Sequence, residues 1–453
     1  MGYAEKNCQL CVVSNNVARL RTKHEPESAG WGYSSATYYS GDELGSICSI
    51  FKEQSGCENV ERDRNEGRRD NWIHFPGRGC TFEGGYNGWK IGAEEMKGMN
   101  LPRYIIKKPA AAKPEKDETD YEKCSEYFIT SQTTCPPCDF EPGELATVRY
   151  GVRDFFPQNY DVGVEFEESG WGVPVHDACW KIFERVSRMR NGEVDLDGFM
   201  ALWFVERGLW QLWIPERKAQ GIIQKCREQF WVHAAGTEYL GANPHDIPGF
   251  LLAVQGVYTN DPEGDGVFRV CKDNKPRHEN PNDPFSKLSA ELRGMVLSRL
   301  SSKDIGSLRL ASWSFRQLPK QLFFRLIQDE LPWFWEFDEL RAVDDSFWGQ
   351  TYAEDDPGDA RNERVKERIQ RSREGNFTNN VNWLEVYKRL CLLTKGIPGV
   401  KNRARVWNVV EEVVARIARL REKGWPQIEP TDEEQETGLV KNSFYCSRCN
   451  WKY

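Results

Sequence analysis

Apolar residues recur at helical spacing in two long segments of the chain. "VHDACWKIFERVSRM" predicts a helix over 176–189, and "NRARVWNVVEEVVARIARLREKGWP" predicts a second helix near the C-terminus. Gly424 and Pro426 are expected to end the second helix. The apolar face of the first helix consists of Cys179, Ile182, Phe183 and Val186. That of the second consists of Val406, Val409, Val410, Val413, Val414, Ile417 and Leu420.

Short strands and turns are predicted before the first helix. "GWGYSSATYYSGDELGS" and "GRGCTFEGGYNGW" are rich in Gly and aromatic residues, and "ELATVRYGVRDFF" is typical of strands. Between them, a segment at about 104–123 is rich in Pro, Ala and charge, and we expect a linker or long loop there. The pattern predicts an α+β protein, with a mixed N-terminal domain over 1–272 and mainly helical regions after it.

A third apolar pattern, "KLSAELRGMVLSRLSSKDIGSLRLAS", consists of two short helical pieces. Ser289 is expected to cap a helix beginning at Ala290, and Ser302 or Asp304 to cap the next. Asp283 and Pro284 precede them as a turn or helix start. Helices of this length are not stable alone, so other groups must cover them. Periodicity alone favours packing in the chain's own core over an interface with another protein.

Composition and charge exclude several function classes. The net charge of −8 argues against a mainly nucleic-acid-binding surface, which needs a basic field. No apolar run approaches the length of a membrane span, and the N-terminus lacks a secretory signal pattern. We therefore expect an intracellular protein of the cytoplasm or nucleus, whose 14 cysteines are free or bind metal.

Three C-x-x-C pairs stand out against the random expectation of about 0.4. Two thiolates three residues apart can bind one ion from a tight turn, and two ligands in the first turn of a helix can bind its opposite side. We therefore expect structural zinc at Cys8, Cys11, His176 and Cys179. The alternative is a buried His and Cys on an apolar helix face.

The two remaining pairs, Cys135/Cys138 and Cys446/Cys449, would form a weaker second zinc site. "CPPC" also fits thiol exchange, although "DFEPGE" after it is a poor helix start for that chemistry. The chain contains no P-loop, no G-x-S-x-G and no H-E-x-x-H. We therefore expect no enzyme. A zinc-containing nucleic-acid-binding or general protein-interaction protein remains an alternative function.

The segment at 283–318 resembles an F-box: a helix, a short break containing Asp, then a leucine-rich turn ending in Ser. Ser289 stands where this family usually has proline. The flanks "HDACW", "ANPHDIP", "WLEVYKRLCLLT" and "NRARVW" are similar to segments of large F-box proteins of filamentous fungi. The box residues that match are Leu288, Glu291, Leu292, Leu297, Leu300, Asp304, Leu308, Arg309, Ser312 and Phe315.

The resemblance implies a substrate receptor of an SCF-type ubiquitin ligase. Its three-helix F-box at 283–328 would dock on the Skp adaptor, which bridges to cullin, and other parts would hold an unknown protein substrate. A mainly helical region at 331–445 and a C-x-x-C tail at 446–453 would follow. No membrane or nucleic-acid partner is expected. The adaptor-binding residues would be Leu288, Glu291, Leu292, Val296, Leu297, Leu300, Ile305, Leu308, Leu310 and Phe315.

Overall fold

The chain is described by a computed structural model. The part of the chain that the structure describes consists of residues 6–31, 55–61, 72–82, 84–134, 142–157, 171–207, 225–226, 235–255, 267–268, 283–316, 318–336, 383–423, 445–446 and 451–452.

The chain divides into two compact units. Unit 1 combines Met1–Asp246 with Lys401–Tyr453, and unit 2 is Ile247–Val400. Unit 2 is therefore inserted into unit 1 along the sequence, and the chain returns to unit 1 within its last long helix.

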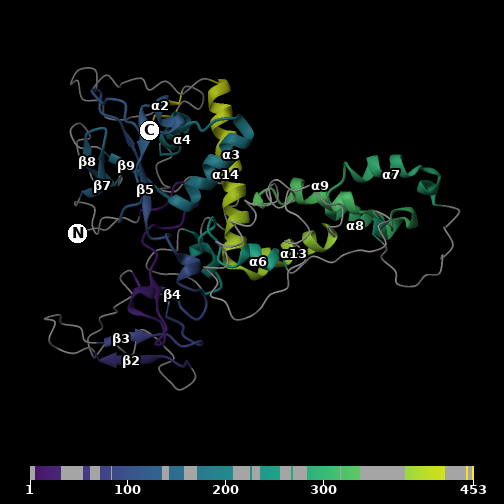
Figure 1. The fold of residues 1–453 in the computed structure, drawn as a ribbon, viewed down its shortest axis with the longest axis horizontal. Coiled ribbons are helices and arrows are strands. Elements are labelled where there is room, and N and C mark those ends of the chain that lie inside the picture. The colour runs from purple at the N-terminus through teal and green to yellow at the C-terminus, as the bar shows by residue number, and fades with distance from the viewer. Residues whose placement is uncertain are drawn as a thin grey trace. The chain divides into compact units, whose positions relative to one another are not determined.

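Unit 1 contains a five-stranded mixed sheet of order β6-β5-β9-β8-β7 (Figure 1). β5 pairs antiparallel with β6 and with β9, β9 pairs parallel with β8, and β8 pairs antiparallel with β7. The register of the central pair places Pro102 opposite His176. The strands are β5 (Pro102–Lys107), β6 (Tyr127–Ile129), β7 (Gly143–Arg149), β8 (Val152–Pro157) and β9 (Trp171–His176).

Aromatic and aliphatic side chains of this sheet form a buried cluster. Its members are Tyr104, Ile106, Phe128, Leu145, Tyr150 and Phe155. Gly172 is needed beside this cluster, because a Cβ there would lie 2.9 Å from Tyr104 and 3.1 Å from Phe155. Residues 104–107, where the sequence analysis expected a linker to begin, instead belong to β5, since their apolar side chains complete this core.

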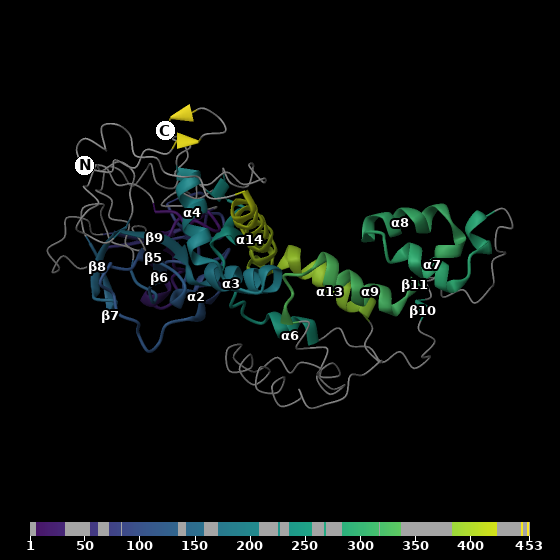
Figure 2. The same ribbon diagram turned by 90° about the horizontal axis from the view of Figure 1, so that it is seen from above.

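Helices pack beside the sheet. α3 contacts β9, and α2 and α4 contact β6 (Figures 1 and 2). α3 confirms the helix predicted over 176–189 and ends at Gly192, whose φ of 82° is the left-handed conformation that glycine adopts most readily. The bounds are α2 (Asp120–Lys123), α3 (Asp177–Asn191), α4 (Leu196–Arg207) and α14 (Pro398–Lys423).

α14 confirms the second long helix and its apolar face. Six of its seven predicted apolar residues are buried: Val406, Val409, Val410, Val413, Val414 and Ile417. From Lys401 onward the helix belongs to unit 1. Its polar residues also bind unit 1, because the Asn402 amide donates to the carbonyls of Leu240 and Ala242 at 3.3 and 2.6 Å.

Short elements complete unit 1. β1 (Arg19–Leu20) pairs parallel with β4 (Tyr86–Asn87), and β2 (Glu58–Glu61) pairs antiparallel with β3 (Trp72–Phe75). β12 (Tyr445–Cys446) pairs antiparallel with β13 (Trp451–Lys452). The 3-10 turns are η1 (Glu27–Ala29), η3 (Glu94–Met96) and η4 (Glu238–Gly241).

Unit 2 is mainly helical, with one short antiparallel pair formed by β10 (Val267–Phe268) and β11 (Leu318–Pro319). α9 packs on α13, and α13 packs on α6 (Figure 2). The helices are α6 (Phe250–Gln255), α7 (Ala290–Leu297), α8 (Ser302–Ala311), α9 (Lys320–Glu330) and α13 (Trp383–Gly396), with 3-10 turns η5 (Pro284–Lys287) and η6 (Trp313–Phe315). The chain is thus α+β with a mainly helical C-terminal region, as expected.

The caps of the short helices follow the sequence closely. Ser289 caps α7, as predicted. Asp283, expected with Pro284 to form a turn or helix start, caps η5. α8 is capped by Ser301, one residue before the predicted Ser302, because the Ser301 hydroxyl accepts from the Asp304 N–H at 3.2 Å. None of the described helices is long and apolar enough to cross a membrane.

Candidate metal centre

Cys8 and Cys11 lie in a tight turn near the N-terminus. The Val12 N–H donates to the Cys8 carbonyl at 2.8 Å, and the Asn7 amide donates to the Val12 carbonyl at 2.8 Å. Val12 adopts a φ of 71°, which is costly for a β-branched residue and persists only where surrounding contacts fix it. The strained backbone at Val12 is therefore part of the turn that places the Cys8 and Cys11 sulfurs close together.

His176 and Cys179 come from the junction of β9 and α3. His176 is the last residue of β9 and the N-cap of α3, and Cys179 lies in the first turn of α3. The two halves of the site are joined directly, since the Gln9 N–H donates to the Pro174 carbonyl at 3.1 Å and the His176 N–H donates to the Cys8 sulfur at 3.3 Å.

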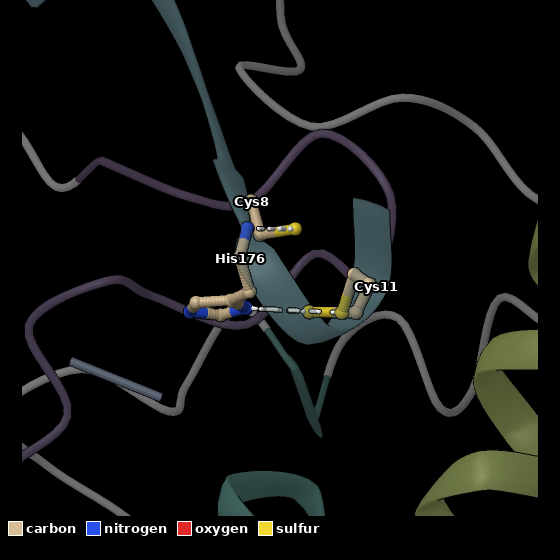
Figure 3. Close-up of side chains that lie close together, drawn as sticks. Cys8, Cys11 and His176 are labelled. Carbon is tan, nitrogen blue, oxygen red and sulfur yellow. Dashed lines mark hydrogen bonds between the residues drawn. The ribbon is translucent and has the colours of Figure 1, made fainter. Parts of the chain in front are cut away.

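The four side chains converge, and all four are buried. Their ligand atoms lie within 4.8 Å of one another. The His176 Nδ1 lies 3.2 Å from the Cys11 sulfur (Figure 3). It lies 4.0 Å from the Cys179 sulfur. Ligands about 2.0–2.3 Å from a tetrahedral zinc ion are roughly 3.5 Å from one another, so small shifts of these side chains would allow coordination.

The protonation states of these groups depend on one another. Burial raises the pKa of Cys179, and the nearby Cys11 and Cys8 raise it further. Burial also acts to raise the pKa of Cys11, but Cys179, Cys8 and His176 together lower it. Burial opposes the charged form of His176, yet the Cys11 and Cys8 sulfurs raise its pKa to about 10. The protein thus places negative charge on buried sulfur, which a cation would neutralise.

Arg405 of α14 lies behind the sulfurs. Its Nη1 donates to the Cys11 carbonyl at 2.9 Å and to the Cys226 sulfur at 3.4 Å, and Asn402 orients its Nε at 2.9 Å. Arg405 is half-buried. Three thiolates, one neutral imidazole and a divalent cation would carry a net charge of −1, which the nearby positive charge of Arg405 would offset.

These residues could therefore hold a metal ion. The alternative drawn from the sequence, packing of a neutral His and Cys, does not account for the two further sulfurs, of Cys8 and Cys11, that lie at the same point. The Nε2 of His176 has no hydrogen-bond partner in the described structure, so only its Nδ1 side takes part in the site.

Comparison with protein-family models, with curated proteins and with solved structures finds no match for this chain.

The residues that the F-box resemblance assigns to adaptor binding differ in how far they are exposed to solvent. Leu297, Ile305 and Phe315 are buried in unit 2. Glu291, Leu292 and Leu310 are exposed. Half-buried positions are Leu288, Val296, Leu300 and Leu308.

Sequence analysis missed a further cluster, formed by Cys57, His74 and Cys80. These residues do not form a short sequence motif such as C-x-x-C, so the sequence alone did not indicate them. The weaker predicted zinc site lies outside the described residues: Cys135, Cys138 and Cys449 are not described, and neither is the side chain of Cys446.

Proposed function

We propose that this chain is a non-catalytic F-box-type adaptor whose unit 2 docks on the Skp adaptor of an SCF-type ubiquitin ligase. The Skp adaptor bridges to cullin, and other surfaces of the chain hold a protein substrate. Such a receptor accelerates ubiquitin transfer by proximity, since it brings substrate and conjugating enzyme together without acting on either chemically.

The observation that supports docking is the exposure of large apolar side chains on the short helices. Leu292 and Met295 lie one turn apart on α7 and are 47% and 63% exposed. Leu310, in the last turn of α8, is 92% exposed. Large apolar side chains that stay exposed on short helices are available for contact with a protein partner.

The helices that carry these residues are held in place from behind. Arg293 of α7 donates to the Ser314 carbonyl at 3.0 Å and so ties α7 to η6. Asp283 accepts from the hydroxyls of Ser312 and Ser314 at 2.6 and 3.0 Å. The helices are thus fixed while their apolar residues stay outside, a preorganised arrangement that reduces the entropic cost of binding.

The test is capture of purified Skp adaptor by the full chain. L292D/L310D should weaken binding about 100-fold or more, because it places two charges in a desolvated contact. Leu392 of α13 is 60% exposed, and L392D is the matched control that should bind as wild type. Circular dichroism checks that all variants are folded. Equal capture of L292D/L310D and wild type, or no capture by wild type, would contradict the proposal.

We further infer that the ion at Cys8, Cys11, His176 and Cys179 is zinc, because three sulfurs and one imidazole form a closed tetrahedral donor set that zinc prefers. Elemental analysis of the purified chain should find zinc, and C8S/C11S should lose one equivalent. C124S, which changes an exposed cysteine outside the cluster, should retain it. An unchanged zinc content in C8S/C11S would refute the assignment.

A further inference from the structure

Cys57, His74 and Cys80 meet beside the β2–β3 hairpin. Cys57 immediately precedes β2, His74 lies in β3, and Cys80 lies in the turn that follows β3. One donor atom of each lies within 4.8 Å of those of the other two. The His74 Nε2 is 3.3 Å from the Cys80 sulfur. Three segments that are separate in sequence thus present two sulfurs and one ring nitrogen to one point.

The loop that carries Cys80 is fixed by backbone contact with the Cys57 segment. At Gly77, a Cβ would lie 2.1 Å from the Ser55 carbonyl oxygen and 2.3 Å from the Gly56 carbonyl carbon, so only glycine permits this approach. The Gly79 N–H donates to the Ser55 carbonyl at 3.1 Å. Gly56 itself has a φ of 66°. Two glycines therefore hold the two thiol-bearing segments against one another.

Side chains from a third segment fix the same loop from its other side. The Asn87 amide donates to the Gly77 carbonyl at 3.0 Å, and the Trp89 indole donates to the Pro76 carbonyl at 2.9 Å. The Gly77 N–H donates to the Cys57 sulfur at 3.3 Å, which fixes the position of this sulfur. The donors are therefore preorganised by the chain itself, as metal ligands require.

The donor types suit a thiophilic divalent ion. Two sulfurs and one imidazole nitrogen are the donor types that zinc binds in proteins. His74 is buried, whereas Cys57 and Cys80 are half-buried. Solvent therefore reaches the sulfur side of the cluster. This differs from the site at Cys8, where all four donors are buried.

We propose that Cys57, His74 and Cys80 form a second zinc site, in which the described part of the chain supplies three ligands and leaves a fourth position open to solvent. Three-ligand sites of this kind exchange their fourth ligand, in contrast to closed structural sites. The site lies within unit 1 and is independent of the proposed docking function of unit 2.

The experiment measures alkylation of each cysteine in the full wild-type chain by peptide mass spectrometry. Added zinc should slow alkylation of Cys57 and Cys80 at least tenfold, and a chelator should restore it. Exposed Cys124 is the internal control, whose rate should not change. Cys8 and Cys11 report on the closed site separately. A chelator titration should release zinc from Cys57 and Cys80 at lower concentration, because their site has one donor fewer.

The variant H74F provides a second measurement. It should lower the zinc content by one equivalent and abolish zinc protection of Cys57 and Cys80, while Cys8 and Cys11 stay protected. Protection of Cys8 and Cys11 also shows that unit 1 is folded. Two results would overturn the proposal: alkylation of Cys57 and Cys80 that zinc does not change, or a disulfide between them in zinc-loaded protein.

Discussion

Glu122 is a buried charge of unit 1 with a defined set of partners. Its carboxylate lies outside the candidate metal centre and is fully buried. It pairs with the Arg149 guanidinium at 2.9 and 3.2 Å and accepts from the N–H groups of Ile129 and Thr119 at 3.0 and 2.9 Å. A buried carboxylate with this many donors is fixed in its charged form.

The Glu122 pair predicts a pH dependence of unit 1. Burial alone would raise the pKa of Glu122, but Arg149 and the two N–H groups outweigh it and lower the pKa below 4.5. The resulting stability is present above the unfolded pKa and is lost as the pH falls through the folded pKa. E122Q should destabilise the chain by about 3 kcal/mol at pH 7 and flatten this acid dependence. Thermal unfolding at pH 7 and pH 3.5 measures both; an unchanged acid slope would contradict the prediction.

Arg405 carries a second prediction for a single residue. R405M removes the charge behind the sulfurs and should weaken metal binding at the Cys8 site about 10- to 100-fold, as loss of an outer-shell partner does. Competition with a metal chelator measures the affinity. R188M is the matched control, because Arg188 forms an exposed pair with Asp120 on the same unit. Equal affinities of R405M and R188M would show that Arg405 is not coupled to the ion.

At the scale of elements, α9 satisfies the ends of both short helices. Arg325 donates to the carbonyls of Leu297 and Leu300 at 3.0 Å each, and also to that of Ser298, where α7 ends. Glu330 accepts from the Ser302 N–H at 2.6 Å, where α8 begins. Helix ends need such partners. α9 therefore aligns α7 and α8 by their termini as well as through apolar contacts.

R325M should thus destabilise unit 2 by about 2 kcal/mol, because three carbonyls lose a charged donor. Hydrogen exchange of α7 amides measures the loss locally, and exchange in α3 of unit 1 should stay as in wild type. R299M changes an exposed arginine close to the same carbonyls and serves as the control. The prediction fails if R325M and R299M exchange alike.

Sequence periodicity predicted α3 and α14 well, because one face of each helix is apolar over several turns. Caps were predicted almost as well, since Ser289 and Asp283 act on the backbone two or three residues away. The sheet order was not accessible: β5 pairs with β9 across more than sixty residues, and no local pattern encodes that register. For the same reason, spacing drew attention to the Cys8 pair but missed Cys57, whose partners are set by a hairpin and a glycine contact.

For the whole molecule, the decisive feature is that α14 completes unit 1 from the far end of the sequence. The Arg403 guanidinium is buried and donates to the carbonyls of Pro244 and His245 at 2.7 and 2.6 Å. The valines of α14 are buried along its length. The core of unit 1 is therefore incomplete until the residues from Lys401 onward have packed against it.

Truncation tests this dependence. A chain ending at Gly396 should lose cooperative thermal unfolding and bind zinc at the Cys8 site more weakly, because Arg405 and the α14 valines are gone. A chain ending at Lys423 retains α14 and should unfold near the wild-type temperature. Calorimetry and elemental analysis measure the two effects. Wild-type unfolding of the chain ending at Gly396 would show that α14 is dispensable.

Because unit 2 is inserted into unit 1, the two segments of unit 1 are synthesised at different times. The ribosome must add Ile247–Val400 after the first part of unit 1 has emerged, which takes roughly 10 to 30 s at ordinary elongation rates. Cys179 leaves the ribosome well before that interval begins. An ion captured by Cys8, Cys11, His176 and Cys179 can therefore join the N-terminal turn to α3 early, and hold the nascent unit together until α14 arrives to close it.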